Sequence, residues 1–115
     1  MTVQALFDEV AARLLAEDDA VEQTRMMGSD GLKTGGKFFA MVSRGELVVK
    51  LPRERVDELV EAKAGHHFDP GHGRLMKEWV ALRPDDEAEC AAYVSEARSF
   101  VGGQPIRRTR AESEV

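Results

Sequence analysis

The sequence contains one cysteine and no long apolar run, and both shortages exclude classes of protein. Cys90 stands alone, so no disulfide forms within the chain, which agrees with a reducing compartment. The apolar run Phe38 to Val42 is far shorter than the roughly 20 residues that span a bilayer. The N-terminus lacks a basic region ahead of an apolar one and reaches an acid at Asp8, so we expect no signal peptide. These features predict a cytoplasmic protein that does not cross a membrane.

Aromatic residues are also scarce, at 6%, while charged residues make up 32% of the 115 residues and leave a net charge of -5. The charge is unevenly distributed. Residues 26–83 hold ten bases and eight acids, whereas residues 1–25 hold six acids and two bases and residues 84–101 hold five acids and one base. Because an acidic chain repels polyanions at long range, any contact with nucleic acid depends on a local basic patch.

Apolar periodicity predicts three helices around a set of short strands. Helical spacing places Val3, Leu6, Phe7, Val10 and Leu14 on one stripe. A short surface helix is expected after Pro52, and a third helix from Pro84 to the glycines at 102 and 103. The expected strands are Val21 to Met27, a start near Leu32, Lys37 to Ser43, Leu47 to Leu51, a brief one at His67 and Phe68, and Leu75 to Leu82.

The turns between these strands indicate the topology. Thr34-Gly35-Gly36 and Ser43-Arg44-Gly45-Glu46 are both typical of tight hairpins. The simplest arrangement is an α+β fold in which an antiparallel β-sheet meander is flanked by N- and C-terminal helices, with a short helix between strands. We expect one domain over residues 1–101. Residues 102–115 have too few apolar side chains to offset chain entropy and are expected to form a disordered polar tail.

No complete catalytic motif is present. Ser29 and Ser43 lack the setting of an activated nucleophile, and Cys90 lies on a helix stripe expected to face the core. His66, His67 and His72 occur within seven residues and keep open a small-molecule or metal-dependent activity. Their spacing is not a known ligand pattern, and adjacent histidines point to opposite faces of a strand. The favoured prediction is therefore a protein that is not an enzyme and needs no cofactor.

The basic middle of the chain is the candidate interaction surface. Its cations could gather on the open side of the sheet: Arg25, Lys33, Lys37, Arg44, Lys50, Arg53, Arg55, Arg74 and Lys77. Aromatic residues are interleaved with them, although alternation sends one of Phe38 and Phe39 into the core. Lys33, Lys37, Arg44 and Lys50 are the residues that we predict to form the contact surface. A mixed solvated face is the alternative, given the eight acids in the same region.

Three stretches together resemble one family. They are Arg25-Met26-Met27-Gly28-Ser29-Asp30-Gly31-Leu32, the pair of runs Phe38 to Val42 and Glu46 to Lys50, and Gly73-Arg74-Leu75-Met76-Lys77-Glu78-Trp79-Val80. In this order they resemble the TfoX (Sxy) N-terminal domain family over roughly residues 3–101. Met27 stands where that family commonly has Phe, and Leu75 stands where Pro is common, but both positions keep an apolar residue.

The resemblance implies a small α+β domain found in proteins named as regulators of natural competence, similar in architecture to the YjbR/MmcQ group. It implies no catalytic residues and no cofactor. The expected partner is an unknown protein, with weak DNA contact as the lesser alternative. Full-length competence regulators carry a second helical domain, whereas this sequence continues from the family region into a short polar segment.

The resemblance also marks residues that we expect to hold the architecture: Arg25, Met26, Gly28, Gly31, Arg74, Met76 and Trp79. Gly28 and Gly31 are predicted to permit a turn with positive φ. Trp79 is predicted to bury its ring between the sheet and a helix.

Overall fold

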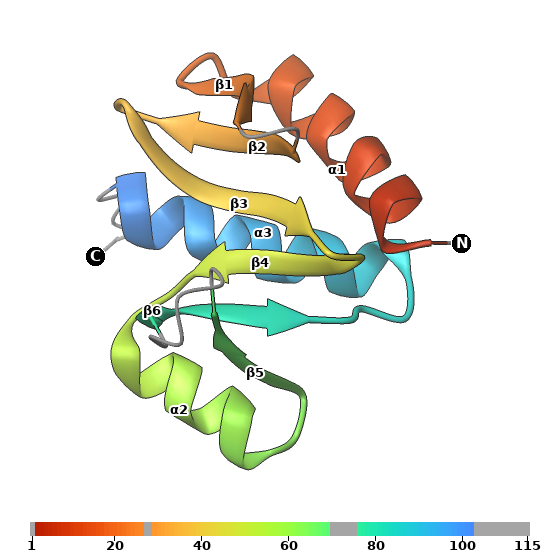
Figure 1. Cartoon of the computed structure of the whole chain (residues 1–115). Coiled ribbons are helices and arrows are strands. Elements are labelled where there is room, and N and C mark those ends of the chain that lie inside the picture. Colours follow the sequence, from red (N-terminus) through yellow and green to blue (C-terminus); the bar gives the residue numbers. More distant parts are fainter. Residues whose placement is uncertain (1, 27–28, 70–75, 103–115) are drawn as a thin grey trace, which may run out of the picture.

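Three helices and a six-stranded antiparallel sheet make up the fold, in a computed structural model that describes residues 2–26, 29–69 and 76–102 (Figure 1). The helices are α1 (Val3–Glu17), α2 (Arg53–Glu61) and α3 (Glu87–Gly102). The strands are β1 (Val21–Met26), β2 (Ser29–Thr34), β3 (Lys37–Ser43), β4 (Glu46–Lys50), β5 (Gly65–Phe68) and β6 (Met76–Leu82). The predicted α+β class and the flanking terminal helices are confirmed. The expected tail starts at Gly102, which the structure places in the last turn of α3, and residues 103–115 lie outside the described residues.

The sheet order is β1-β2-β3-β4-β6-β5. The first four strands form the predicted meander. Both predicted hairpin turns have positive φ at their two central residues, namely Gly35 and Gly36 at 58° and 80°, and Arg44 and Gly45 at 54° and 77°. Such turns match the twist of the strands that they join. The meander ends at β4, because α2 and the edge strand β5 follow before β6 returns to pair with both β4 and β5.

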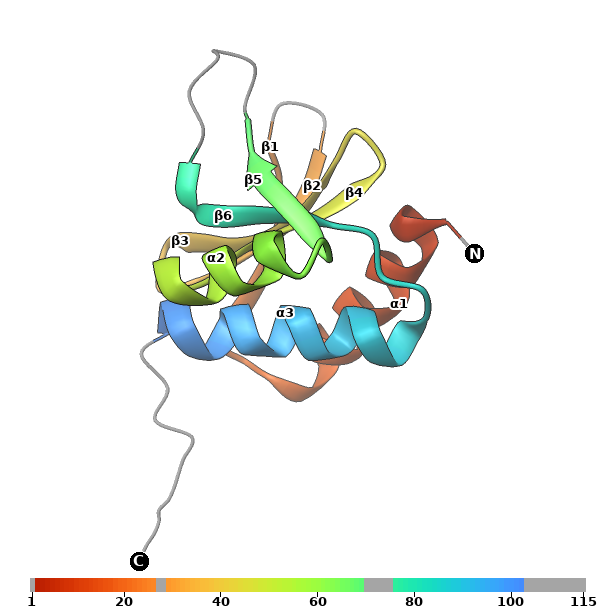
Figure 2. The ribbon, with the colours of Figure 1, turned by 90° about the horizontal axis from the view of Figure 1, so that it is seen from below.

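All three helices contribute to one core and so cover the same face of the sheet, as Figure 2 shows for α2 and α3. The buried residues of this core come from every helix and from five strands: Leu6, Phe7 and Val10 of α1, Val56 and Leu59 of α2, Cys90, Val94 and Ala97 of α3, and Val21, Leu32, Phe39, Val49 and Val80 of the sheet. The opposite side, here called the outer face, carries no helix of the described part of the chain.

A β-bulge at Phe39 decides which aromatic enters the core. Leu32 pairs with Ala40 while Lys33 pairs with Phe38, so β3 has one residue more than β2 at this point. Phe39 and Ala40 are therefore both buried in the core, and Phe38 is half-buried. The prediction that only one of the two phenylalanines turns inward is confirmed.

Ion pairs connect the three helices. Arg98 on α3 donates to Asp18 after α1, with Nε 2.8 Å from Oδ2 and Nη2 3.4 Å from Oδ1. Arg13 on α1 pairs with Glu87 at the start of α3. Arg55 on α2 pairs with Glu96 on α3 at 2.8 Å. The acids that close α1 are unfavourable at its C-terminus, and the Arg98 guanidinium offsets one of them.

The Asp18–Arg98 pair makes stability depend on acidity. Its hydrogen bond from Arg98 holds the pKa of the Asp18 carboxyl below its usual 3.8. A lowered folded-state pKa adds stability above the unfolded-state value, and this stability is lost as the pH falls through the folded-state value. We expect Asp18→Asn, whose amide oxygen still accepts from the Ala20 N–H, to cost about 1 kcal/mol at pH 7 and almost nothing at pH 2.

Thermal unfolding of the wild type and Asp18→Asn from pH 2 to pH 7 measures this difference. Asp19→Asn, at the exposed neighbouring carboxylate, is the matched control and should change little at any pH. A difference between Asp18→Asn and the wild type that persists unchanged at pH 2 would contradict the role assigned to the charge.

Candidate functional site

Two surface depressions contain the residues singled out by the sequence. The first lies where β4 ends and β6 begins, has a volume of about 410 Å³ and is lined by Lys50, Arg53, Met76, Lys77, Glu78 and Trp79. We call it the Trp79 depression. Lys50 and Trp79 are direct cross-strand partners, and the Lys50 ammonium lies 5.9 Å from the centroid of the Trp79 ring. This distance allows a cation–π interaction.

Trp79 is half-buried and lies outside the core cluster, so the expectation that its ring packs between the sheet and a helix is wrong. The physical reason is the alternation of β6. Val80 and Leu82 point into the core, which leaves Trp79 on the outer face beside Lys50. Trp79 is therefore available as a contact residue.

The structure separates the four cations predicted to form the contact surface. Lys33 and Lys37 flank the β2–β3 hairpin, and Lys50 lies at the same end of the sheet because β4 runs antiparallel to β3. Arg44 lies at the other end, in the β3–β4 turn, where its Nη1 donates to the carbonyl of Asp69 at 3.0 Å. Arg53 and Lys77 join Lys50 in the Trp79 depression.

The family-signature residues fall into three groups. Arg25 and Met26 pair with Asp30 and Ser29 in the β1–β2 register, and Met76 and Trp79 lie in β6. Gly28 and Arg74 lie outside the described residues. Gly31 is buried within β2 and is not among the residues with positive φ, so the turn predicted there is wrong.

The role of Gly31 is steric. A Cβ at this position would lie 2.9 Å from Cε1 of Phe38, so only glycine leaves room for that ring on the outer face.

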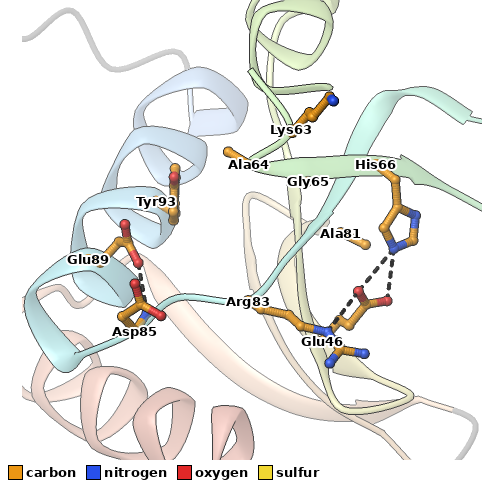
Figure 3. Close-up of a pocket in the computed structure, with 10 residues that line it drawn as sticks. All are labelled: Glu46, Lys63, Ala64, Gly65, His66, Ala81, Arg83, Asp85, Glu89 and Tyr93. Carbon is orange, nitrogen blue, oxygen red and sulfur yellow. Dashed lines mark hydrogen bonds and ion pairs between the residues drawn. The ribbon is translucent and has the colours of Figure 1, made fainter. Parts of the chain in front are cut away.

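The second depression, of about 470 Å³, lies between the start of β5, the end of β6 and the first turns of α3 (Figure 3). Figure 3 shows Tyr93 and Glu89 of α3 on one wall and His66, Arg83 and Glu46 on the other. His66 Nε2 lies 2.9 Å from Glu46 Oε2, and Arg83 Nε donates to the same oxygen at 3.3 Å. The Glu46 carboxylate, followed by the His67 carbonyl, raises the pKa of His66.

The histidines do not converge in the described part of the chain. His66 faces Glu46, whereas His67 lies 3.6 Å from Asp57 of α2, on the opposite side of β5. His72 lies outside the described residues. Over residues 2–26, 29–69 and 76–102, no three His, Cys, Asp or Glu side chains form a group that could hold a metal ion.

The sequence did not predict that Glu46, Arg83 and Tyr93 line one depression, because they are far apart in the chain. Glu46 begins β4, Arg83 follows β6 and Tyr93 lies in α3. It also missed the exposure of Met76 and the outward orientation of Trp79, because alternation along a strand does not say which of its two faces meets the helices.

A family model described as the TfoX N-terminal domain matches residues 13–101, from the middle of α1 to the end of α3. The chain belongs to the TfoX N-terminal domain family. The match includes all six strands of this TfoX N-terminal domain and both depressions. Neither a curated protein nor a solved structure matches the chain significantly. No helix of the described residues is long and apolar enough to cross a membrane.

Proposed function

We propose that this TfoX N-terminal domain is a non-enzymatic regulatory protein that acts by binding another protein through the Trp79 depression. Membership of the family fits a role in regulation. The observation that carries the proposal is the Lys50–Trp79 pair on the outer face, where Arg53, Lys77 and the 39% exposed Met76 surround it. An exposed cluster of aromatic, methionine and cationic side chains is typical of contact surfaces.

The state of the single cysteine supports the non-enzymatic part of the proposal. Burial raises the pKa of the Cys90 thiol to about 11, so the thiol is protonated at neutral pH and is a poor nucleophile. The buried thiol therefore favours a structural role over nucleophilic catalysis.

A competence-related process and a cytoplasmic location remain part of this proposal, since the family resemblance and the single cysteine support them. The second candidate function is binding of a small molecule in the depression lined by His66, which the 470 Å³ volume favours. A metal-dependent form of that candidate is tested by metal analysis of tag-free protein.

Complementation in the source organism tests the regulatory proposal. Deletion of the gene should change a defined set of transcripts, and the wild-type gene should restore them. We expect Lys50→Glu to reproduce the deletion, because it reverses a charge at the centre of the Trp79 depression. Lys63→Glu is the matched control, since Lys63 is an exposed lysine that lines the other depression.

Protein levels are compared by immunoblot so that loss of the protein is not read as loss of function. An unchanged transcript profile after deletion would contradict the regulatory role. If the Lys50→Glu gene restores the transcripts and the Lys63→Glu gene does not, the function belongs to the depression lined by His66.

A further inference from the structure

The Trp79 depression has the opposite charge to the molecule that carries it. Lys50, Arg53 and Lys77 contribute three positive charges and Glu78 one negative charge, which leaves a local excess of two positive charges on a chain of net charge -5. The excess already includes Glu78, whose carboxylate lies 3.9 Å from the ammonium of the half-buried Lys50 and forms only a weak surface ion pair with it. The depression therefore attracts acidic groups locally, while the rest of the surface repels them.

The same depression presents apolar surface. Met76 is 39% exposed, and it is one of two large hydrophobic residues of the described chain with that degree of exposure. The Trp79 ring lies beside it, half-buried, with Lys50 directly across the strand pair. Methionine adapts to the shape of a partner, and tryptophan offers a large rigid surface. A bound group must therefore supply an apolar side chain as well as negative charge.

We propose that the Trp79 depression binds a short acidic segment of a partner protein, with one apolar side chain of the segment packed on Met76 and Trp79 and its carboxylates paired with Lys50, Arg53 and Lys77. The inference rests on the proposed function, because it names the chemistry of the partner at the same site. The cation–π contact holds the Lys50 ammonium beside the ring, so the apolar and ionic contacts of the segment are adjacent.

The distribution of cations favours a peptide over a nucleic acid. A single strand of nucleic acid needs a continuous basic track and several aromatic platforms. Lys33 is directly opposite Glu22 in the β1–β2 register, and Arg44 is at the far end of the sheet with its guanidinium on the Asp69 carbonyl. Among the described residues, Lys50, Arg53 and Lys77 thus form a compact patch that fits two or three carboxylates, with Lys37 at the same end of the sheet.

Selection from a library of random 12-residue peptides displayed on phage tests the proposal with the whole chain as bait. We expect the enriched peptides to carry two or more Asp or Glu residues next to a large apolar residue. Synthetic copies with a fluorescent label should bind at least tenfold more weakly to Lys50→Glu and to Trp79→Ala in anisotropy titrations. Binding to Lys63→Glu should stay within twofold of the wild type.

Circular dichroism of each variant establishes that it is folded. Peptides without acids, binding that Lys50→Glu leaves unchanged, or no enrichment at all would each overturn the proposal. So would submicromolar binding of a twenty-residue oligothymidine that Lys50→Glu abolishes, because the surface would then be a nucleic-acid site.

The two proposals fail in different ways. If Lys50→Glu fails to restore the transcripts and the selection yields no acidic peptide, the regulatory role is supported and the acidic partner is rejected. Acidic peptides that depend on Lys50, with no transcript effect, would establish the surface and reject the regulatory role.

Discussion

Phe39→Ala is expected to cost about 3–5 kcal/mol of unfolding free energy, which is the range for removing a fully buried aromatic side chain. Phe39 has no exposed surface and belongs to the core beneath all three helices. Because small domains are stable by only about 5–15 kcal/mol, this single change should remove a large part of the total. Urea denaturation followed by circular dichroism measures the loss as a shift in the midpoint.

Phe38→Ala is the matched control, since it removes the same atoms from the preceding position in β3. Phe38 is half-buried on the outer face, so its loss should cost less than half as much. Equal costs for the two variants would contradict the assignment of Phe39, and not Phe38, to the core.

Among the glycines that the structure describes, Gly65 should be the one whose change to Ala is most damaging, with a cost of roughly 1–3 kcal/mol. A Cβ on Gly65 would lie 2.5 Å from the carbonyl oxygen of Ala81 and 2.6 Å from Cδ2 of Leu82. The first of these atoms is backbone within the β5–β6 ladder and cannot move without breaking strand pairing. We expect a lower thermal midpoint and increased amide exchange confined to β5 and its neighbours.

Gly35→Asn separates this close approach from the general effect of replacing glycine. Gly35 has a positive φ that asparagine tolerates, and a Cβ at this position would meet no atom within 4 Å. Its stability should stay within about 0.5 kcal/mol of the wild type. A Gly65→Ala protein as stable as the wild type would show that β5 moves away from β6 at no cost.

Local chemistry explains why the helices and hairpins could be predicted. The Gly35-Gly36 and Arg44-Gly45 turns need positive φ, which few residue types tolerate. A few adjacent residues in the sequence are therefore enough to predict where these turns lie. Pro52 and Pro84 likewise mark where α2 and α3 begin. The resemblance to the TfoX N-terminal domain family rested on several such stretches in order, and the family match confirmed it.

Long-range packing explains what could not be predicted. Insertion of β6 between β4 and β5 depends on strands that are separated by a helix along the chain. The outward orientation of Trp79 follows from Val80 and Leu82 entering the core, and the sequence alone left both orientations open. Gly31 was expected in a turn, but it lies in a strand, where its lack of a side chain leaves space for the Phe38 ring on the neighbouring strand.

By itself, the sequence determined the α+β class, the helices, the two glycine turns and the family, because each depends on residues close together in the chain or on their order. Only the tertiary structure decided which charges meet. Asp18 and Arg98 are 80 residues apart, and Lys50 meets Trp79 only through the β4–β6 register. The type of a charged or aromatic side chain does not identify the residue that it will contact. The contacts that define the Trp79 depression therefore depend on how the strands pair in the sheet.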